Sequence, residues 1–86
     1  MLKLKPCAVM REECDGTGLV FDPDTNRAIA LNRTGVAVWR GLEKGADADE
    51  IAKGMLCMFK VDSLEQARAD VEAFLAVLAE RGLVRP

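Results

Sequence analysis

Apolar residues in the first 31 positions occur as short runs separated by turn-forming residues, a pattern typical of β-strands. The runs predict strands over residues 7–13, 19–21 and 28–31. The intervening segments 15–18 and 22–26 hold glycine, proline, aspartate and asparagine, which favour tight turns. Connections this short favour antiparallel hairpins, because parallel strands need a long crossover. We therefore expect a three-stranded antiparallel meander whose last strand lies at the edge of the sheet.

After residue 31 the apolar residues recur at the spacing of amphipathic helices. Asn32 follows the last strand directly and is a preferred N-cap residue, so it predicts the start of a first helix. Asp47 with Glu50, and Ser63 with Gln66, match the capping-box pattern and predict the starts of a second and a third helix. In each box the side chain of the first residue is expected to accept a backbone N–H of the first turn.

The third predicted helix carries the longest apolar stripe of the chain. Its members are Leu64, Ala67, Val71, Phe74, Leu75 and Leu78. The residues that border this stripe on one side are Arg68, Glu72 and Ala79, and those on the other are Asp70, Val77 and Arg81. Most of the stripe is expected in the core, and the bordering residues are expected to line any groove between this helix and the sheet edge.

Three residues within the helices have a predicted packing role. Trp39, the single tryptophan, is expected in the core rather than stacked on a ligand. Gly35 is expected to let the first helix pack closely. Gly54 lies in the middle of the second helix, where glycine costs roughly 1 kcal/mol relative to alanine, so we expect another backbone to approach it.

The two ends of the chain have a less distinct pattern. Residues 1–5 are a short basic segment that Pro6 separates from the first strand. This segment is a frayed end, an additional edge segment, or an arm that pairs with a second copy of the chain. Gly82 is expected to end the third helix, and residues 83–84 to fold back as an apolar anchor.

Three helices after a small sheet predict an α+β, winged-helix-like fold. The length of 86 residues fits a single domain spanning residues 1–86, and a half-apolar composition allows a core without metals or disulfides.

Composition argues against several functional classes. The formal net charge is −2 with acids and bases interspersed, whereas nucleic-acid binding usually requires a basic surface. The chain has no histidine and no tyrosine, and no glycine-rich loop precedes a helix, so we expect no catalysis, no cofactor and no metal. Three cysteines without CxxC spacing fit a reducing, cytoplasmic environment. No apolar run is long enough to span a membrane, so no membrane partner is expected.

The order and spacing of several motifs resemble the PqqD-like family over about residues 9–84. These motifs occupy residues 19–26, 30–35, 38–39, 45, 49–51, 59–62 and 69–84. The resemblance implies a RiPP recognition element, a non-catalytic adaptor that binds the leader of a ribosomally made precursor peptide. It also implies that the adaptor presents the peptide to a modifying enzyme, often a radical SAM protein. Residues 34–45 differ from the family members that serve pyrroloquinoline quinone synthesis, and lasso-peptide systems share much of the same outline.

In that family the leader adds as a strand beside the third strand, over a groove formed with the third helix. Carried onto this sequence, the strand residues that are expected to bind peptide are Arg27, Ala28, Ile29, Ala30 and Leu31. The helix residues that are expected to line the groove are Arg68, Val71, Glu72 and Leu75. Charge preference at the rim is assigned to Arg27, Arg68 and Glu72.

Two alternatives use the same fold differently. A winged-helix DNA-binding regulator fits the helix order, although the acidic start of the second helix at residues 47–50 disfavours contact with phosphates. A general protein-interaction or dimerisation domain is the other alternative, because an open sheet edge also pairs with a second copy to form a homodimer.

Overall fold

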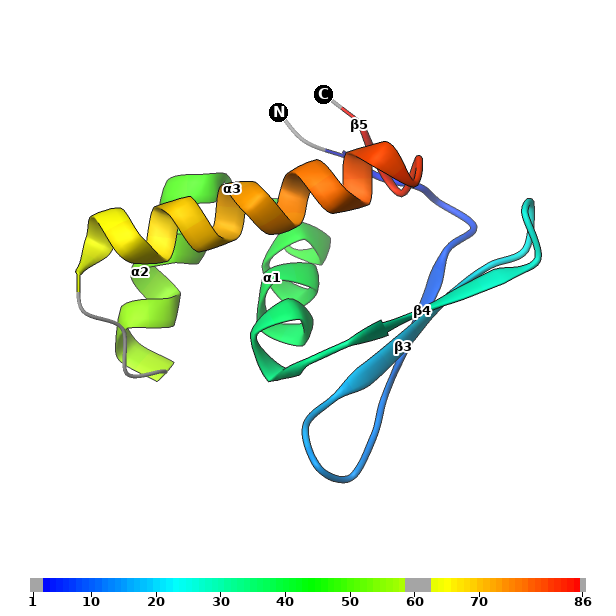
Figure 1. The fold of residues 1–86 in the computed structure, drawn as a ribbon, viewed down its shortest axis with the longest axis horizontal. Coiled ribbons are helices and arrows are strands. Elements are labelled where there is room, and N and C mark those ends of the chain that lie inside the picture. The colour runs from blue at the N-terminus through cyan, green and yellow to red at the C-terminus, as the bar shows by residue number, and fades with distance from the viewer. Residues whose placement is uncertain (1–2, 59–62, 86) are drawn as a thin grey trace.

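The computed structural model describes residues 3–58 and 63–85. Within these residues the strands are β1 (Lys3–Leu4), β2 (Val9–Glu12), β3 (Gly18–Asp22), β4 (Arg27–Leu31) and β5 (Val84–Arg85), and the helices are α1 (Arg33–Glu43), α2 (Ala48–Met58) and α3 (Leu64–Glu80). The predicted α+β order is therefore confirmed: a meander of β2, β3 and β4 precedes the three helices of the described chain (Figure 1). The family motif at residues 59–62 lies outside the described residues.

The meander has the antiparallel order β2-β3-β4, and its two faces differ in burial. Val20 on β3 pairs with Ile29 on β4, and the side chains of Val20 and Leu31 are buried beneath the helices. Leu19 and Phe21 alternate with the buried positions and remain exposed on the opposite face. This alternation fixes which side of the sheet faces the core.

Local capping explains why each helix begins where it does. The Asn32 side chain accepts the Gly35 N–H at 2.8 Å, so β4 passes into α1 through a single residue. At the start of α2 the box is reciprocal: Asp47 accepts the Glu50 N–H at 2.9 Å, and Glu50 accepts the Asp47 N–H at 3.2 Å. At the start of α3, Ser63 accepts the N–H of Gln66 at 3.1 Å. The predicted starts are therefore confirmed.

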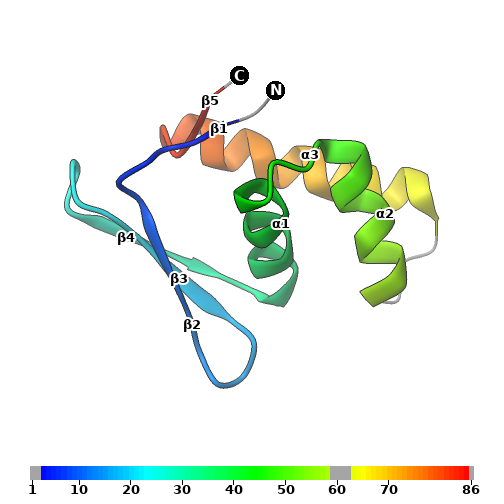
Figure 2. The same ribbon diagram turned by 180° about the vertical axis from the view of Figure 1, so that it is seen from behind.

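The core lies where the three helices meet the inner face of the sheet. Trp39 on α1 is 1% exposed and is a core residue, as predicted. It belongs to one buried cluster with Met55 of α2 and Val71 and Leu78 of α3. Figure 1 and the reverse view in Figure 2 show α3 lying across α1 and α2, with the sheet extending away from α1. α1 is thus the helix that joins the sheet to the rest of the molecule.

The two ends of the described chain pair with each other. β1 and β5 form a short antiparallel ladder in which Leu4 is opposite Val84, and Figures 1 and 2 show the termini close together. Leu83 and Val84 are buried, which confirms the predicted apolar anchor. The N-terminal segment is therefore neither frayed at Lys3 and Leu4 nor an arm directed away from its own chain.

A polar contact holds this end against the β3–β4 turn. The ammonium of Lys5 lies 3.0 Å from Asp22 and 3.1 Å from Asp24. The hydrogen bond from Lys5 lowers the pKa of Asp22 below its ordinary value, against the opposing effect of burial. Cys7 lies beside the same carboxylates, but the Lys5 ammonium already supplies the cation between them, so we assign no metal there.

The prediction of a close backbone approach at Gly54 is wrong. Among the described residues, a Cβ added at Gly54 would meet no atom within 4 Å, whereas a Cβ at Gly41 of α1 would lie 2.7 Å from Ile51 Cγ1. The close contact between α1 and α2 therefore lies at Gly41. Gly35 has the packing role expected of it, because the Phe74 ring lies 3.1 Å from the position of its missing Cβ.

Candidate functional site

β4 is an outer strand of the meander. Among the described strands, β3 pairs with one side of β4 and none pairs with the other. An outer strand presents backbone donors and acceptors that need either protection or a partner. Both β2 and β4 are outer strands of the meander, and β4 is the one on which the sequence places the peptide-binding edge.

The direction of the backbone groups on β3 follows from the β2–β3 hairpin. The Glu13 N–H donates to the Thr17 carbonyl at 2.7 Å, just beyond the paired residues of the two strands. Residues of an antiparallel pair alternate between hydrogen-bonded and non-hydrogen-bonded positions. With the observed register, Leu19 and Phe21 therefore direct their backbone groups toward β2. Val20, between them, directs its groups toward β4.

The same alternation identifies the open groups of β4. Val20 is opposite Ile29, so Ile29 exchanges its backbone hydrogen bonds with β3. Ala28 and Ala30, on either side of Ile29, then direct their N–H and C=O groups to the open side. Their small side chains are exposed on the outer face of the sheet and do not obstruct an added strand.

Two hollows lie beside helix α3, one against the inner side of β4 and one against the start of α1. One, of about 410 Å³, is lined by Arg27 and Ile29 of β4 together with Glu80 and Arg81 at the end of α3. The other, of about 380 Å³, lies between the start of α1 and the middle of α3. Its lining includes Asn32, Gly35, Asp70, Ala73, Phe74 and Val77. We call the two hollows together the β4–α3 groove.

The β4–α3 groove is apolar in the middle and charged at its ends. Phe74 is held in place against Gly35, and Val77 beside it is 42% exposed, which is high for a valine. Asp70 provides an anionic group at one end, and the other end carries both the bases and the acids at positions 22, 27, 80 and 81. The groove therefore offers apolar contact to one face of an extended chain and charges of both signs at the end beside β4.

The predicted strand residues all lie on β4, but only Ala28 and Ala30 direct their backbone groups to its open side, and the predicted helix residues do not line the groove. Val71 is 0% exposed and Leu75 is 9% exposed, so both point into the core. Arg68 forms ion pairs with Glu72 and with Asp49 of α2, on the side of α3 that faces away from β4. These pairs, that with Glu72 first, raise the pKa of Arg68 above its ordinary value.

The groove-lining residues of α3 are instead Asp70, Ala73, Phe74 and Val77. The sequence did carry a signal for them, because Asp70 and Val77 border the apolar stripe on the opposite side from Arg68. Choosing between the two borders requires knowing on which side α2 packs, and the stripe itself does not contain that information. In the described part of the chain, no helix is long and apolar enough to cross a membrane.

Comparisons with known proteins agree with this architecture. No curated protein matches the chain in sequence. A solved structure described as TbiB1 in complex with the TbiA(beta) leader peptide has a TM-score of 0.85 and 24% identity, covering 96% of this chain and 94% of that one. A lasso peptide synthetase B1 complexed with the leader peptide has a TM-score of 0.85 and 21% identity, covering 99% of this chain and 98% of that one.

At these identities the two structures establish the shared fold. A family model goes further, because it matches residues 17–84, which is most of the sequence and includes β3, β4 and all three described helices. Its description is coenzyme PQQ synthesis protein D (PqqD). The chain belongs to the PqqD family.

Proposed function

We propose that this protein is a non-catalytic adaptor that binds the leader segment of a ribosomally made precursor peptide by strand addition at β4. The observation that carries the proposal is the open edge of β4, where Ala28 and Ala30 direct their backbone groups outward beside the β4–α3 groove. Family membership supports the proposal, and so do the titles of the two similar structures, which describe complexes with leader peptides.

In strand addition, backbone groups supply the affinity and side-chain contacts supply the selectivity. Backbone hydrogen bonds to β4 are available to any extended peptide, so they supply affinity with little dependence on sequence. Alternate side chains of the added strand would face the groove, where Phe74 and Val77 favour an apolar residue. The other end, where Arg27 and Arg81 lie with two acids, favours a polar residue. The preferred leader is therefore an extended segment with apolar and polar residues at alternate positions.

An adaptor of this kind acts by presenting its peptide to a second protein. We propose a peptide-modifying enzyme in the cytoplasm as that protein, and a radical SAM enzyme is the class that the family resemblance suggests. Co-purification of the chain with the modifying enzyme encoded beside its gene, with and without the precursor peptide, tests this assignment. A complex that forms with an enzyme of another class would replace the radical SAM assignment and leave the leader-binding proposal intact.

Replacement of Ala30 by proline tests strand addition directly. Proline removes one outward N–H and places a ring where the added strand would lie, while proline is tolerated at outward positions of edge strands. The fluorescein-labelled leader of the precursor encoded beside the gene, measured by fluorescence anisotropy, should bind Ala30→Pro about 10- to 100-fold more weakly.

Ala30→Val is the matched control, because it changes the same side chain but keeps the N–H. It should bind the leader nearly as well as the parent chain. Circular dichroism of both variants checks that they remain folded. If folded Ala30→Pro binds the leader as tightly as Ala30→Val, the peptide does not add to β4.

A second copy of the chain competes for the same edge, since any open strand can pair with another. Sedimentation velocity over a concentration series separates the two uses. Leader binding that dissociates a dimer would identify the edge as shared between copies and peptide. A chain that stays monomeric at all concentrations would show that a second copy does not compete with the leader for β4.

A further inference from the structure

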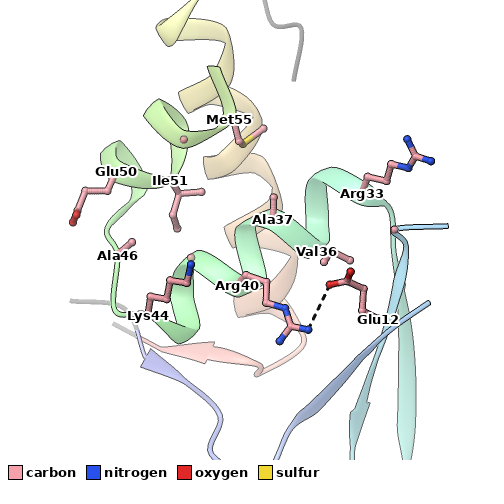
Figure 3. A pocket seen from close by; sticks show the side chains of 13 residues that line it. Glu12, Arg33, Val36, Ala37, Arg40, Lys44, Ala46, Glu50, Ile51 and Met55 are labelled. Atoms are coloured by element: carbon pink, nitrogen blue, oxygen red, sulfur yellow. Dashed lines mark hydrogen bonds and ion pairs between the residues drawn. The ribbon is translucent and has the colours of Figure 1, made fainter. Parts of the chain in front are cut away.

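A second concave site lies on the other side of α1 from the β4–α3 groove. It has a volume of about 520 Å³, and Figure 3 shows it between α1 and α2, with Glu12 of β2 at one margin. Its lining residues come from β2, the β2–β3 turn, α1, α2 and the α1–α2 connection, and none of them belongs to β4 or α3. We call it the α1–α2 cavity. The lining differs completely from that of the groove.

The floor of the α1–α2 cavity is apolar. Val36 of α1 and Ile51 and Met55 of α2 line it, and each belongs to the buried core. Ala37 continues the apolar surface along α1. Apart from Glu12 of β2 at the margin, this surface comes from helices, whose backbone groups are satisfied within each helix, and from the turns beside them. A protein segment that binds this surface must likewise satisfy its own backbone, which favours a helix over an extended chain.

Basic residues line the cavity at positions 33 and 40 of α1 and at Lys44, just after its end. Arg40 is already paired, with Glu43 at 3.0 Å and with Glu12 at 3.5 Å. Arg33 donates its Nε–H to the Asp15 carbonyl at 2.8 Å, and Figure 3 shows its side chain directed away from the cavity. Within the described residues Lys44 has no carboxylate within 4.0 Å, so its ammonium is the cation left to a ligand of the cavity.

The one acidic rim residue besides Glu12 is engaged elsewhere. Glu50 accepts the Asp47 N–H at 3.2 Å in the capping box of α2, so its carboxylate is oriented by the backbone.

Gly54 opens the wall of the cavity. It lines the cavity from the middle of α2, and a Cβ placed there would meet nothing within 4 Å. Glycine weakens a helix interior, and in the described structure no neighbour fills the space that this glycine leaves. The position thus keeps room in the cavity at the expense of helix stability.

We propose that the α1–α2 cavity docks an acidic amphipathic helix of a partner protein. An apolar side chain of that helix enters the space beside Gly54, and a carboxylate beside it pairs with Lys44. Helix-in-groove docking of this kind reads an apolar stripe and flanking charges. The cavity and the groove lie on different sides of α1, so leader and partner bind together. Identifying the partner as the peptide-modifying enzyme rests on the proposed function; the docking surface itself does not.

A synthetic helix tests the surface without knowledge of the natural partner. The acidic probe is a helical peptide of about four turns with leucines at i, i+3, i+4 and i+7 and glutamates on either side. The control peptide, the lysine probe, has the same leucines but lysines in place of the glutamates. Titration into the isotope-labelled full chain, followed by amide NMR, should give saturable shifts at Ala37, Gly41, Gly54 and Met55 with the acidic probe. The lysine probe should give none.

Two variants sharpen the result. Gly54→Leu fills the cavity, and Lys44→Glu reverses a surface charge with little risk to folding; each should weaken the acidic probe at least about tenfold. Lys53→Glu is the matched control, because it makes the same charge change on α2 at a residue outside the lining, and it should leave the affinity unchanged.

Three outcomes overturn the proposal: no saturable shifts, equal binding of the two probes, or acidic-probe shifts confined to β4 and α3. A parallel titration with the leader keeps the two proposals apart. Leader shifts at β4 in Gly54→Leu, together with loss of the acidic probe, support both. Loss of leader binding by the parent chain, with the acidic probe still bound, removes only the proposed function.

Discussion

The two sides of α1 differ in what they offer a ligand. On the groove side, β4 presents unpaired backbone groups at Ala28 and Ala30, so the contact is mainly with main chain. On the cavity side, α1 and α2 present only side chains, with an apolar floor and basic rim residues. The first surface suits an unfolded segment that gains its hydrogen bonds on binding. The second suits a segment that is already folded. One small domain thus has room for a peptide and for a structured partner.

The glycines on the two sides reflect this difference. On the groove side, the Phe74 ring fills the space beside Gly35 and forms a fixed wall of the groove. On the cavity side, Ile51 fills the space beside Gly41, whereas no described residue fills the space beside Gly54. The groove is therefore a tightly packed site whose open feature is a strand edge. The cavity is an incompletely packed site whose open feature is space.

The largest expected effect comes from a core substitution that destabilises the groove and the cavity together. Trp39 is 1% exposed in the core of α1, the wall that the groove and the cavity share. Trp39→Ala should lower the free energy of unfolding by about 3–5 kcal/mol, because it deletes the largest buried side chain and leaves a cavity. Urea unfolding followed by circular dichroism measures the loss.

Trp39→Phe is the control, and it should lose less, because an aromatic ring still fills part of the site. Leader and acidic-helix binding should decline together in Trp39→Ala. Loss of one with full retention of the other in this variant would show that the two sides do not depend on a common wall.

The next effect separates two glycines that look equivalent in the sequence. A Cβ at Gly41 would lie 2.7 Å from Ile51 Cγ1, so Gly41→Ala forces α1 and α2 apart. It should lower the free energy of unfolding by about 1–3 kcal/mol, which is typical of overpacking. Urea unfolding curves of the variant and the parent chain give the difference.

Gly54→Ala is its matched comparison and should change stability in the opposite direction. The added methyl meets nothing within 4 Å, so the variant should gain up to about 1 kcal/mol from helix propensity alone. If Gly54→Ala destabilises the chain as much as Gly41→Ala, then space at Gly54 is not free and the cavity is filled in solution.

These two glycines also show where sequence reasoning reached its limit. The element order, the helix starts and the turns were predictable because each depends on residues within three or four positions, such as Asn32 before Gly35 or Asp47 before Glu50. A close helix contact at Gly41 depends on a residue of another helix. No local pattern distinguishes that glycine from Gly54.

The same reasoning explains the outcome for the peptide site. The edge of β4 followed from strand order, and strand order followed from short hairpins. The pairing of β1 with β5 was less accessible, because it joins residues at the two ends of the chain. Which border of the α3 stripe faces β4 depends on the side that α2 occupies. The apolar stripe alone therefore does not distinguish the predicted border around Arg68 from the opposite border, whose side chains Asp70 and Val77 line the groove.

The smallest expected effect comes from a variant that tests which border of α3 contacts the leader. Arg68 pairs with Glu72 and Asp49 at the surface, where all three side chains are close to half exposed. Exposed ion pairs contribute little, so Arg68→Ala should lower the free energy of unfolding by less than about 1 kcal/mol. Fluorescence anisotropy with the labelled leader should show no change in affinity, because the pair lies on the side of α3 toward α2.

Val77→Asp provides the contrast on the groove side of the same helix, with Ala76→Asp as the matched control outside the groove lining. Burying a new carboxylate under an added strand should weaken leader binding at least about tenfold, or about 1.4 kcal/mol. Ala76→Asp should leave the affinity unchanged, since Ala76 is exposed and is not among the residues that line either hollow. If instead Arg68→Ala weakens leader binding and Val77→Asp does not, the peptide crosses α3 on the side of α2. In that case the charge preference belongs to Arg68 and Glu72, and the apolar hollow at Phe74 does not contact the leader.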